Sequence, residues 1–189
     1  MYGGTYHSPA IAVDSSNIYV VWRGGEIYFK KSDDNGSSWT VEKRLSWTTD
    51  YSLHPSYPAI AVDGSNIYVV WETGLYSPRI YFKKSDDRGA TWTTSKRLSG
   101  NIGAYQYPAI AVDGSNIYVV WQDGTPGQYD IHCKKSDDGG STWTTKWLTR
   151  NAGDSECPAI AVDGSNIYMT WEDDTSGKYE IFFKKGTLY

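Results

Sequence analysis

Apolar and polar positions change in short runs along the whole chain, and no helical period is sustained over three turns. In the segment 108–149, an apolar run at 109–112 ends at Asp113-Gly114, a dipeptide that strongly favours a tight hairpin turn. A β-branched and aromatic run follows at 116–121, and two further strand-like runs lie at 129–135 and 144–149. This pattern predicts four short antiparallel strands joined by turns.

The same pattern returns about every 50 residues along the chain. The segment PAIAVDxSNIYxxW begins at Pro9, Pro58, Pro108 and Pro158, in steps of 49, 50 and 50 residues. Such a period indicates a repeat architecture. The second strand of each repeat is apolar on both faces and needs a neighbour on each side, as in a propeller. We therefore predict an all-β fold: one β-propeller domain of about four blades over residues 1–189, with repeats at roughly 9–57, 58–107, 108–157 and 158–189.

Each second strand also ends in a tryptophan. These four residues are Trp22, Trp71, Trp121 and Trp171. Since a propeller blade packs against the next one on its flat face, we expect all four indole rings to be central to the core.

A second motif, S-x-D-x-G-x-x-W, occurs three times at constant phase with the first. Its members are Ser32, Asp34, Gly36 and Trp39; Ser85, Asp87, Gly89 and Trp92; and Ser136, Asp138, Gly140 and Trp143. The short Asp can bond backbone N–H groups and close the turn, while Gly supplies the positive φ. A calcium loop is the alternative for these acidic turns, but the terminal Glu of such loops is absent.

This motif resembles the Asp box of the bacterial neuraminidase repeat, which occurs in sialidases and many other propellers. The resemblance covers nearly the whole chain. It implies that the three turns are structural, that they connect the third and fourth strands of a blade, and that they lie on the face away from the active site.

The last repeat stops after its third strand, at residues 179–189. The residues before Pro9 align with a connection between blades and do not supply the absent strand. The sequence thus predicts three complete four-stranded blades and a three-stranded fourth blade, which we expect to close into a compact ring. A piece of a larger propeller is one alternative, and self-association through the incomplete fourth blade is another.

The composition of the chain limits the classes of binding partner that we expect. The formal charge is −4, with 18 basic and 22 acidic residues, a balance that argues against nucleic-acid binding. No apolar run is long enough for a membrane span, and the N-terminal segment has no signal-peptide pattern. We expect an extracellular or cell-surface location. Cys133 replaces a core Phe and Cys157 occupies a different repeat position, so a disulfide is not expected. No His or Cys pair has ligand spacing, so neither a metal nor another cofactor is predicted.

The loops depart most from the repeat, and they are the candidate functional segments. Connections after the second strand and after the fourth strand lie at the same end of alternating strands, the end that carries the ligand in sialidase-like propellers. Aromatic rings there can stack on sugars, with charged groups nearby. The candidate ligand-binding residues are Trp47, Tyr51, Tyr76, Arg79, Tyr105, Asp123, Tyr129, Glu172 and Asp173.

Function is less constrained than fold. The Arg-Ile-Pro motif of sialidases is absent, because Arg79-Ile80 is followed by Tyr81. With no catalytic residue assigned, we expect a non-catalytic scaffold or binding module for a glycan or a surface protein. One alternative is a sialidase-like glycoside hydrolase, or a fragment of one, that uses two carboxylates. Its candidates are Glu72, Asp123, Glu172 and Asp173. The other alternative is a self-assembling structural subunit.

Overall fold

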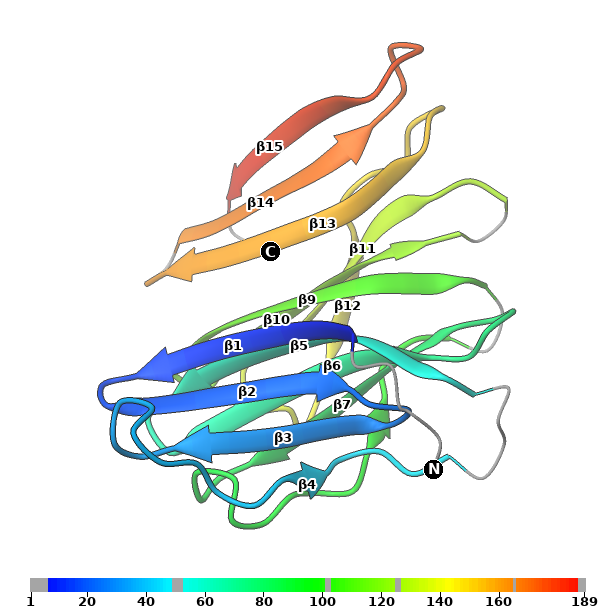
Figure 1. Cartoon of the computed structure of the whole chain (residues 1–189). Coiled ribbons are helices and arrows are strands. Elements are labelled where there is room, and N and C mark those ends of the chain that lie inside the picture. Colours follow the sequence, from blue (N-terminus) through cyan, green and yellow to red (C-terminus); the bar gives the residue numbers. More distant parts are fainter. Residues whose placement is uncertain (1–6, 49–52, 101–102, 125–126, 165, 187–189) are drawn as a thin grey trace.

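The computed structural model describes residues 7–48, 53–100, 103–124, 127–164 and 166–186 (Figure 1). These residues form four antiparallel sheets, three with four strands and one with three, and contain no helix. In every sheet the strands follow one another in chain order. The predicted all-β architecture of about four blades, the last of them three-stranded, is confirmed.

The strands agree with the predicted repeat. Blade 1 holds β1 (His7–Asp14), β2 (Asn17–Arg23), β3 (Ile27–Ser32) and β4 (Lys43–Arg44). Blade 2 holds β5 (Pro55–Asp63), β6 (Asn66–Thr73), β7 (Arg79–Ser85) and β8 (Lys96–Arg97). Blade 3 holds β9 (Tyr105–Asp113), β10 (Asn116–Asp123), β11 (Asp130–Ser136) and β12 (Thr144–Trp147). Blade 4 holds β13 (Ser155–Asp163), β14 (Asn166–Asp173) and β15 (Glu180–Gly186).

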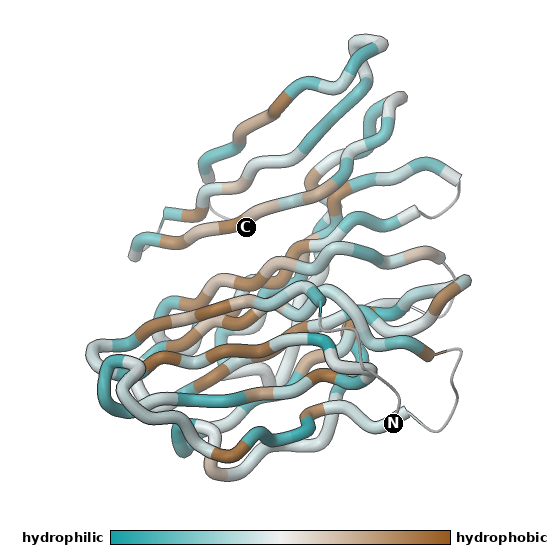
Figure 2. The backbone as a smooth tube through the Cα atoms, in the orientation of Figure 1, coloured by the Kyte–Doolittle hydropathy of each residue, from teal (hydrophilic) through white to brown (hydrophobic). Residues whose placement is uncertain are grey.

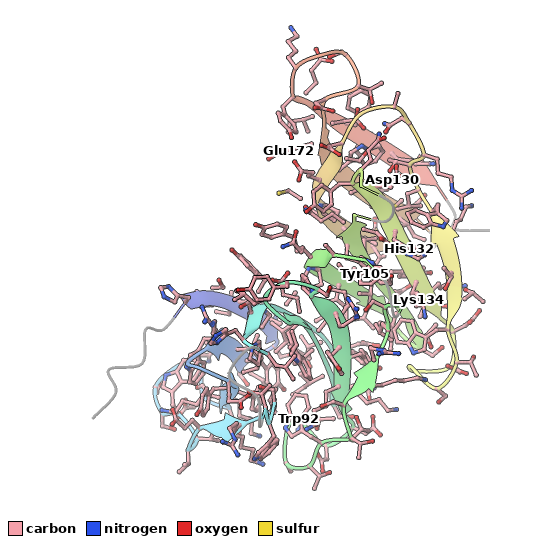
Figure 3. All side chains as sticks on the ribbon, turned by 90° about the vertical axis from the view of Figure 1, so that its right-hand side faces the viewer. Trp92, Tyr105, Asp130, His132, Lys134 and Glu172 are labelled. Carbon is pink, nitrogen blue, oxygen red and sulfur yellow. The ribbon has the colours of Figure 1, made fainter. Side chains whose placement is uncertain are left out.

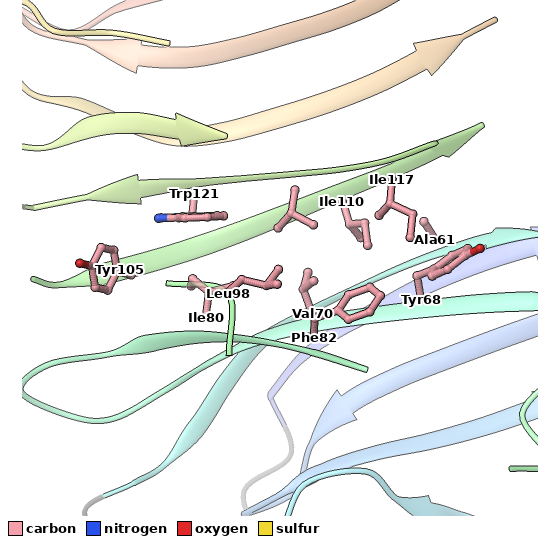
Figure 4. Close-up of a cluster of buried hydrophobic side chains, with 11 residues drawn as sticks. Ala61, Tyr68, Val70, Ile80, Phe82, Leu98, Tyr105, Ile110, Ile117 and Trp121 are labelled. Carbon is pink, nitrogen blue, oxygen red and sulfur yellow. The ribbon is translucent and has the colours of Figure 1, made fainter. Parts of the chain in front are cut away.

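The core lies between consecutive blades. Apolar stretches follow the inner strands, while the connections are largely hydrophilic (Figure 2). Because side chains alternate along a strand, β6 sends Val69 and Trp71 toward blade 1 and Tyr68 and Val70 toward blade 3. Figure 4 shows the interface of blades 2 and 3, where Trp121 packs near residues of both blades. The two apolar faces of each second strand are thus explained by a blade on either side.

The three S-x-D-x-G-x-x-W turns share one hydrogen-bond pattern. In blade 2, the Ser85 hydroxyl donates to Asp87 Oδ1 at 2.7 Å and accepts from the Gly89 N–H at 2.8 Å. The Thr91 hydroxyl donates to Asp87 Oδ2 at 2.6 Å, and the Thr91 N–H donates to both carboxylate oxygens. These donors, with the Thr91 hydroxyl first, lower the pKa of Asp87 to about 2. The carboxylate therefore closes the turn, as the sequence predicts.

The turn glycines of blades 2 and 3, Gly89 and Gly140, each lie against an aromatic ring of the preceding blade. Phe82 of blade 2 makes an edge-to-face contact with Trp143 at a centroid distance of 5.1 Å. A Cβ on Gly140 would lie 2.8 Å from Phe82 Cζ, closer than real Cβ atoms approach. On Gly36, the nearest atom would be Ile18 Cδ1, at 3.6 Å. The two glycines share a φ near +90°, so they differ mainly in the presence of a preceding blade.

We expect Gly140→Ala to destabilise the fold by about 1–3 kcal/mol more than Gly36→Ala, because overpacking adds to the backbone strain that both variants share. Urea unfolding at a concentration that keeps the chain monomeric measures the difference. Equal losses in the two variants would contradict the inter-blade placement of Phe82.

The ring is not closed, and the expectation of a compact four-bladed ring is wrong. The innermost strands β1, β5, β9 and β13 pack consecutively, but β1 and β13 do not pack along each other as the others do. Blades 1 and 4 stand at the two ends of the arc (Figure 1). Their outer faces are exposed, at Ile11 and Phe183 for example. Consequently Trp71, Trp121 and Trp171 are buried as predicted, while Trp22 of blade 1 remains partly exposed.

No helix in the described part of the chain has the length and apolar character needed to cross a membrane.

Candidate functional site

The four blades meet around a pocket at the axis. Each blade contributes the proline that opens its repeat and the residue before it, in a pocket of about 260 Å³. The residues before the prolines are Ser8, Tyr57, Tyr107 and Cys157. The proline is common to all repeats, whereas the residue before it varies between blades. At the axis, the four prolines are therefore the same in every blade, while the side chains before them differ from blade to blade.

The backbone at these variable positions is unusual. Ser8, Tyr57, Tyr107 and Cys157 all have positive φ, between 47° and 52°. Register shifts in the pairing of the first and second strands occur at the same places. Non-glycine residues rarely adopt this conformation, and such strain is often found at functional sites. The bulge places these four residues at the mouth of the pocket.

Two tyrosines form the aromatic side of the pocket. The Tyr57 and Tyr107 rings meet at a centroid distance of 4.7 Å and an angle of 63°. Hydrogen bonding with Tyr57, followed by burial, raises the pKa of Tyr107 to about 12. Both hydroxyls can donate and accept hydrogen bonds beside an aromatic face, an arrangement that suits a polyhydroxylated ring.

Glu72 lies directly behind this aromatic side. It ends the apolar part of β6, is 6% exposed, and accepts a hydrogen bond from the Tyr107 N–H at Oε2, at 3.0 Å. Burial raises the pKa of Glu72 to about 7, and the Tyr107 N–H opposes this shift. The Tyr107 N–H occupies Oε2, which leaves Oε1 as the oxygen that can carry the proton. Glu72 is thus a carboxyl that can carry and release a proton near neutral pH.

The next blade repeats this bond with a neutral group. Gln122 stands at the position of Glu72, and its Oε1 accepts from the Cys157 N–H at 3.0 Å. In blades 2 and 3, the side chain that follows the second-strand Trp therefore reaches the backbone of the following blade. This contact explains why the polar side chain of Gln122 is buried.

Two carboxylates of blade 4 lie near Cys157, the residue that this blade contributes to the pocket with Pro158. Glu156 and Glu172 are directly paired across β13 and β14, and Glu172 is labelled in Figure 3. Burial first, and then the negative charges of Glu172 and Glu156, raise the pKa of the Cys157 thiol. Tyr179 donates to Glu156 Oε2 at 2.8 Å, and this hydrogen bond raises the pKa of Tyr179 to about 12. Two carboxylates thus stand beside the pocket on the blade that follows Tyr107.

Several predicted ligand residues lie in the loops and not at the pocket. Trp47 is exposed, with the Arg44 guanidinium 4.6 Å and the Lys83 ammonium 5.4 Å from its ring. Tyr76 is 88% exposed. Arg79 donates from Nη1 to the carbonyls of Ser77, Pro78 and Gly103, and so joins two loops. Tyr51 lies outside the described residues.

Other predicted residues hold the loops together. Tyr105 is buried between blades 2 and 3 (Figure 3). Asp123 is buried against His132 Nδ1 at 3.2 Å, and Tyr129 donates its hydroxyl to Gln106 at 3.3 Å. Asp173 accepts bonds from Asn151, Ser155, Trp171 and Thr175. Of the nine predicted residues, Glu172 is the one that stands beside the axial pocket, and direct ligand contact by the other described residues stays a prediction.

From the sequence, Glu72 is named as a carboxylate candidate of the hydrolase alternative, whereas Tyr107 and Cys157 are not placed in a binding site. A signal for these two was present, because the residue before each repeat proline varies as Ser, Tyr, Tyr and Cys within an otherwise uniform segment.

The described residues contain no cluster of side chains that would support metal binding. Within the described ranges, no three His, Cys, Asp or Glu side chains come together in a way that could hold an ion. Both cysteines are free, with Cys133 buried and Cys157 exposed.

No protein-family model matches this sequence. No curated protein matches it either.

Solved structures do share its fold. The GH93 α-L-arabinofuranosidase of Fusarium graminearum, solved with arabinobiose, matches with a TM-score of 0.74 and 12% identity, over 98% of this chain and 64% of that one. An α-L-arabinanase of Penicillium chrysogenum, also with arabinobiose, matches with a TM-score of 0.72 and 11% identity, over 96% and 62%. The GH43 endo-arabinanase of Bacillus licheniformis matches with a TM-score of 0.61 and 15% identity, over 98% and 72%. The chain thus spans about two thirds of the length of these enzymes.

These matches confirm a propeller fold and correct one expectation. The non-catalytic scaffold was expected because no catalytic residue could be assigned in the sequence, yet the solved structures named above, which share the fold, are glycoside hydrolases. The three enzymes named above are two arabinanases and an arabinofuranosidase, and none of the three is a sialidase.

Proposed function

We propose that this protein is a propeller-type glycoside hydrolase that takes a sugar of an arabinose-containing glycan into its axial pocket. One observation carries the proposal. Glu72 is a buried carboxyl with a pKa raised to about 7, and it is hydrogen-bonded to the backbone N–H of Tyr107, which lines the pocket. A general acid is most effective when its pKa lies near the working pH.

The size and lining of the pocket support a small sugar ring. Sites for drug-sized ligands span about 300–1,000 Å³, so a pocket of about 260 Å³ suits a smaller molecule. Tyr57 and Tyr107 offer ring faces to the apolar side of a sugar and hydroxyls to its polar side. The arabinose class is taken from the fold neighbours, two of which were solved with arabinobiose.

The proposed reaction uses two carboxyl groups. Protonated Glu72 donates its proton from Oε1 to the glycosidic oxygen as the bond from that oxygen to the anomeric carbon breaks. Glu172 accepts a proton from the water whose oxygen bonds to the anomeric carbon. The products are two free sugar hydroxyl ends, and the two carboxyls return to their starting states after one proton passes back through solvent. Paired acid and base carboxyls are the usual machinery of glycoside hydrolysis.

Two finer points belong to this proposal. The S-x-D-x-G-x-x-W turns link the chain by sequence to Asp-box propellers, but the absence of Arg-Ile-Pro favours arabinosides over sialosides as substrates. A polymeric glycan substrate also favours an extracellular or cell-surface location.

The thiol of Cys157 provides a direct test of sugar occupancy. Cys157 is exposed and lines the pocket, whereas Cys133 is buried and serves as the internal control. We expect arabinose or arabinobiose to slow alkylation of Cys157 severalfold, because a bound ring covers the thiol. The measurement is peptide mass spectrometry after timed alkylation, alongside release of reducing sugar from arabinan.

Glucose at the same concentration is the matched ligand control for this experiment. Alkylation of Cys157 at an unchanged rate with every pentoside, together with no release of sugar from arabinan, would contradict the proposed function.

A further inference from the structure

The two terminal blades each leave one apolar face uncovered. The blade-4 face consists of Ala159, Ala161, Tyr168, Thr170, Ile181 and Phe183, and the blade-1 face consists of Ile11, Val13, Ile18, Val20 and Trp22. Exposure is highest at Ile181 (74%), Phe183 (64%) and Ile11 (64%). Contiguous apolar surface of this kind usually marks an interaction site.

The two faces are the halves of the interface that already joins the blades. Between blades 2 and 3, one half consists of Ala59, Ala61, Tyr68, Val70, Ile80 and Phe82, and the other of Ile110, Val112, Ile117, Val119 and Trp121 (Figure 4). Aligned by repeat, the blade-4 face has the residue types of the first half, with Ile181 and Phe183 at the positions of Ile80 and Phe82. The one exception is Thr170, which replaces Val70. The blade-1 face has those of the second half without exception. One chain therefore carries both sides of a complementary interface.

The internal interfaces also contain an aromatic contact between a Phe of one blade and the turn Trp of the next. At the two ends of the arc, the two partners of this contact stand on different faces of the molecule. Phe29 packs edge-to-face with Trp92 at 5.1 Å, and a Cβ on Gly89 would lie 2.6 Å from the Phe29 ring. At the ends of the arc, Phe183 is exposed, Trp39 is 43% exposed, and the space over Gly36 contains no aromatic ring among the described residues. Phe183 of one copy thus matches the open place over Gly36 and Trp39 of another.

The blade-1 face contains a hollow that could accept side chains of a blade docked on it. It has a volume of about 440 Å³ and is lined by His7, Pro9, Val20, Trp22 and Glu42. In its described part, blade 4 has three strands and no equivalent of Leu45, Leu98 and Leu148, the buried residues that follow the fourth strands of the other blades, so the intermolecular contact is smaller than the internal ones.

We propose that the blade-4 face of one copy docks on the blade-1 face of a second copy, which continues the blade stack from molecule to molecule. Because the two faces differ, the contact is heterologous and leads to a closed ring or an open filament according to the rotation at each step. A second copy is the occupant that the repeat itself specifies, since the first- to third-strand residues named above for the internal interface have their equivalents on the two faces, with Thr170 in place of Val70. The inference rests on the blade faces and is independent of the axial pocket.

Sedimentation velocity across a wide concentration range tests the association. We expect the wild-type chain to exceed the monomer mass as its concentration rises. Phe183→Asp disables the blade-4 face and Ile11→Asp disables the blade-1 face, so each variant alone stays monomeric. A 1:1 mixture of the two variants restores one intact contact and gives a heterodimer of twice the monomer mass, with nothing larger.

Leu75→Asp is the matched control, because Leu75 is an exposed apolar residue of blade 2 that belongs to neither face. It should assemble as the wild type does, and tryptophan fluorescence should show that all variants keep the folded spectrum. Wild-type protein that remains monomeric at every concentration would overturn the proposal, and so would a mixture of the two variants that fails to form the heterodimer.

Discussion

Trp121→Ala is expected to remove about 3–5 kcal/mol of unfolding free energy, the usual cost of truncating a buried Trp. The Trp121 side chain is fully buried and packs with Ile80, Leu98 and Tyr105 at the interface of blades 2 and 3. Its ring also lies 4.9 Å from His132 by centroids. A domain is commonly stable by only about 5–15 kcal/mol, so the variant should unfold at ordinary temperature or lose its cooperative transition. Urea unfolding followed by fluorescence and circular dichroism measures the effect.

Trp22→Ala is the matched comparison within the same chain. Trp22 occupies the equivalent position of blade 1 and stacks on Tyr28 at 6.0 Å, but no blade covers its outer face. Its truncation should cost less than about 2 kcal/mol in dilute monomeric protein, because less of the ring is removed from water in the wild type. Equal losses at the two positions would contradict an open arc, since a closed ring would bury Trp22 as fully as Trp121.

The contrast between these two tryptophans also shows what the sequence could predict. The repeat placed both at the end of a second strand with apolar faces, and this local assignment is confirmed. It could not distinguish them, because identical repeats carry no information on which blade stands at an end of the arc. That difference depends on the rotation between successive blades, which side-chain packing determines in three dimensions.

The candidate site was predictable only in part for a similar reason. The loops differ between repeats, and they do lie at one end, with Ile27 bonded to Ser46 and Tyr129 bonded to Asp154 across the two loop sets. Yet Asp173, which looks available in the sequence, is buried and holds its own loop through four donors. A carboxylate in an acidic loop can serve the backbone or a ligand, and only its partners distinguish the two roles.

Glu72 is the reverse case, because nothing in the sequence indicates that this polar residue is buried, and contact with the next blade buries it. Its pKa is raised from 4.5 to about 7, mainly by burial. The folded state therefore holds the proton more tightly than the unfolded state, and stability falls as pH rises from about 4.5 to about 7. A shift of this size corresponds to roughly 3 kcal/mol of stability at pH 8 relative to pH 4.

Glu72→Gln should remove this penalty and, if Glu72 is the general acid, lower hydrolysis by about 10²–10⁴-fold. The amide can keep the bond to the Tyr107 N–H, as Gln122 does with Cys157 in the next blade. The variant should thus match the wild type in stability near pH 4 and exceed it by up to about 3 kcal/mol at pH 8. Urea unfolding at both pH values and arabinan hydrolysis measure the two effects, with exposed Glu42→Gln as the charge-matched control. A gain in stability that is independent of pH would refute the buried, protonated state of Glu72, whereas a stabilised variant with full activity would refute only its role as the acid, so the two claims can fail separately.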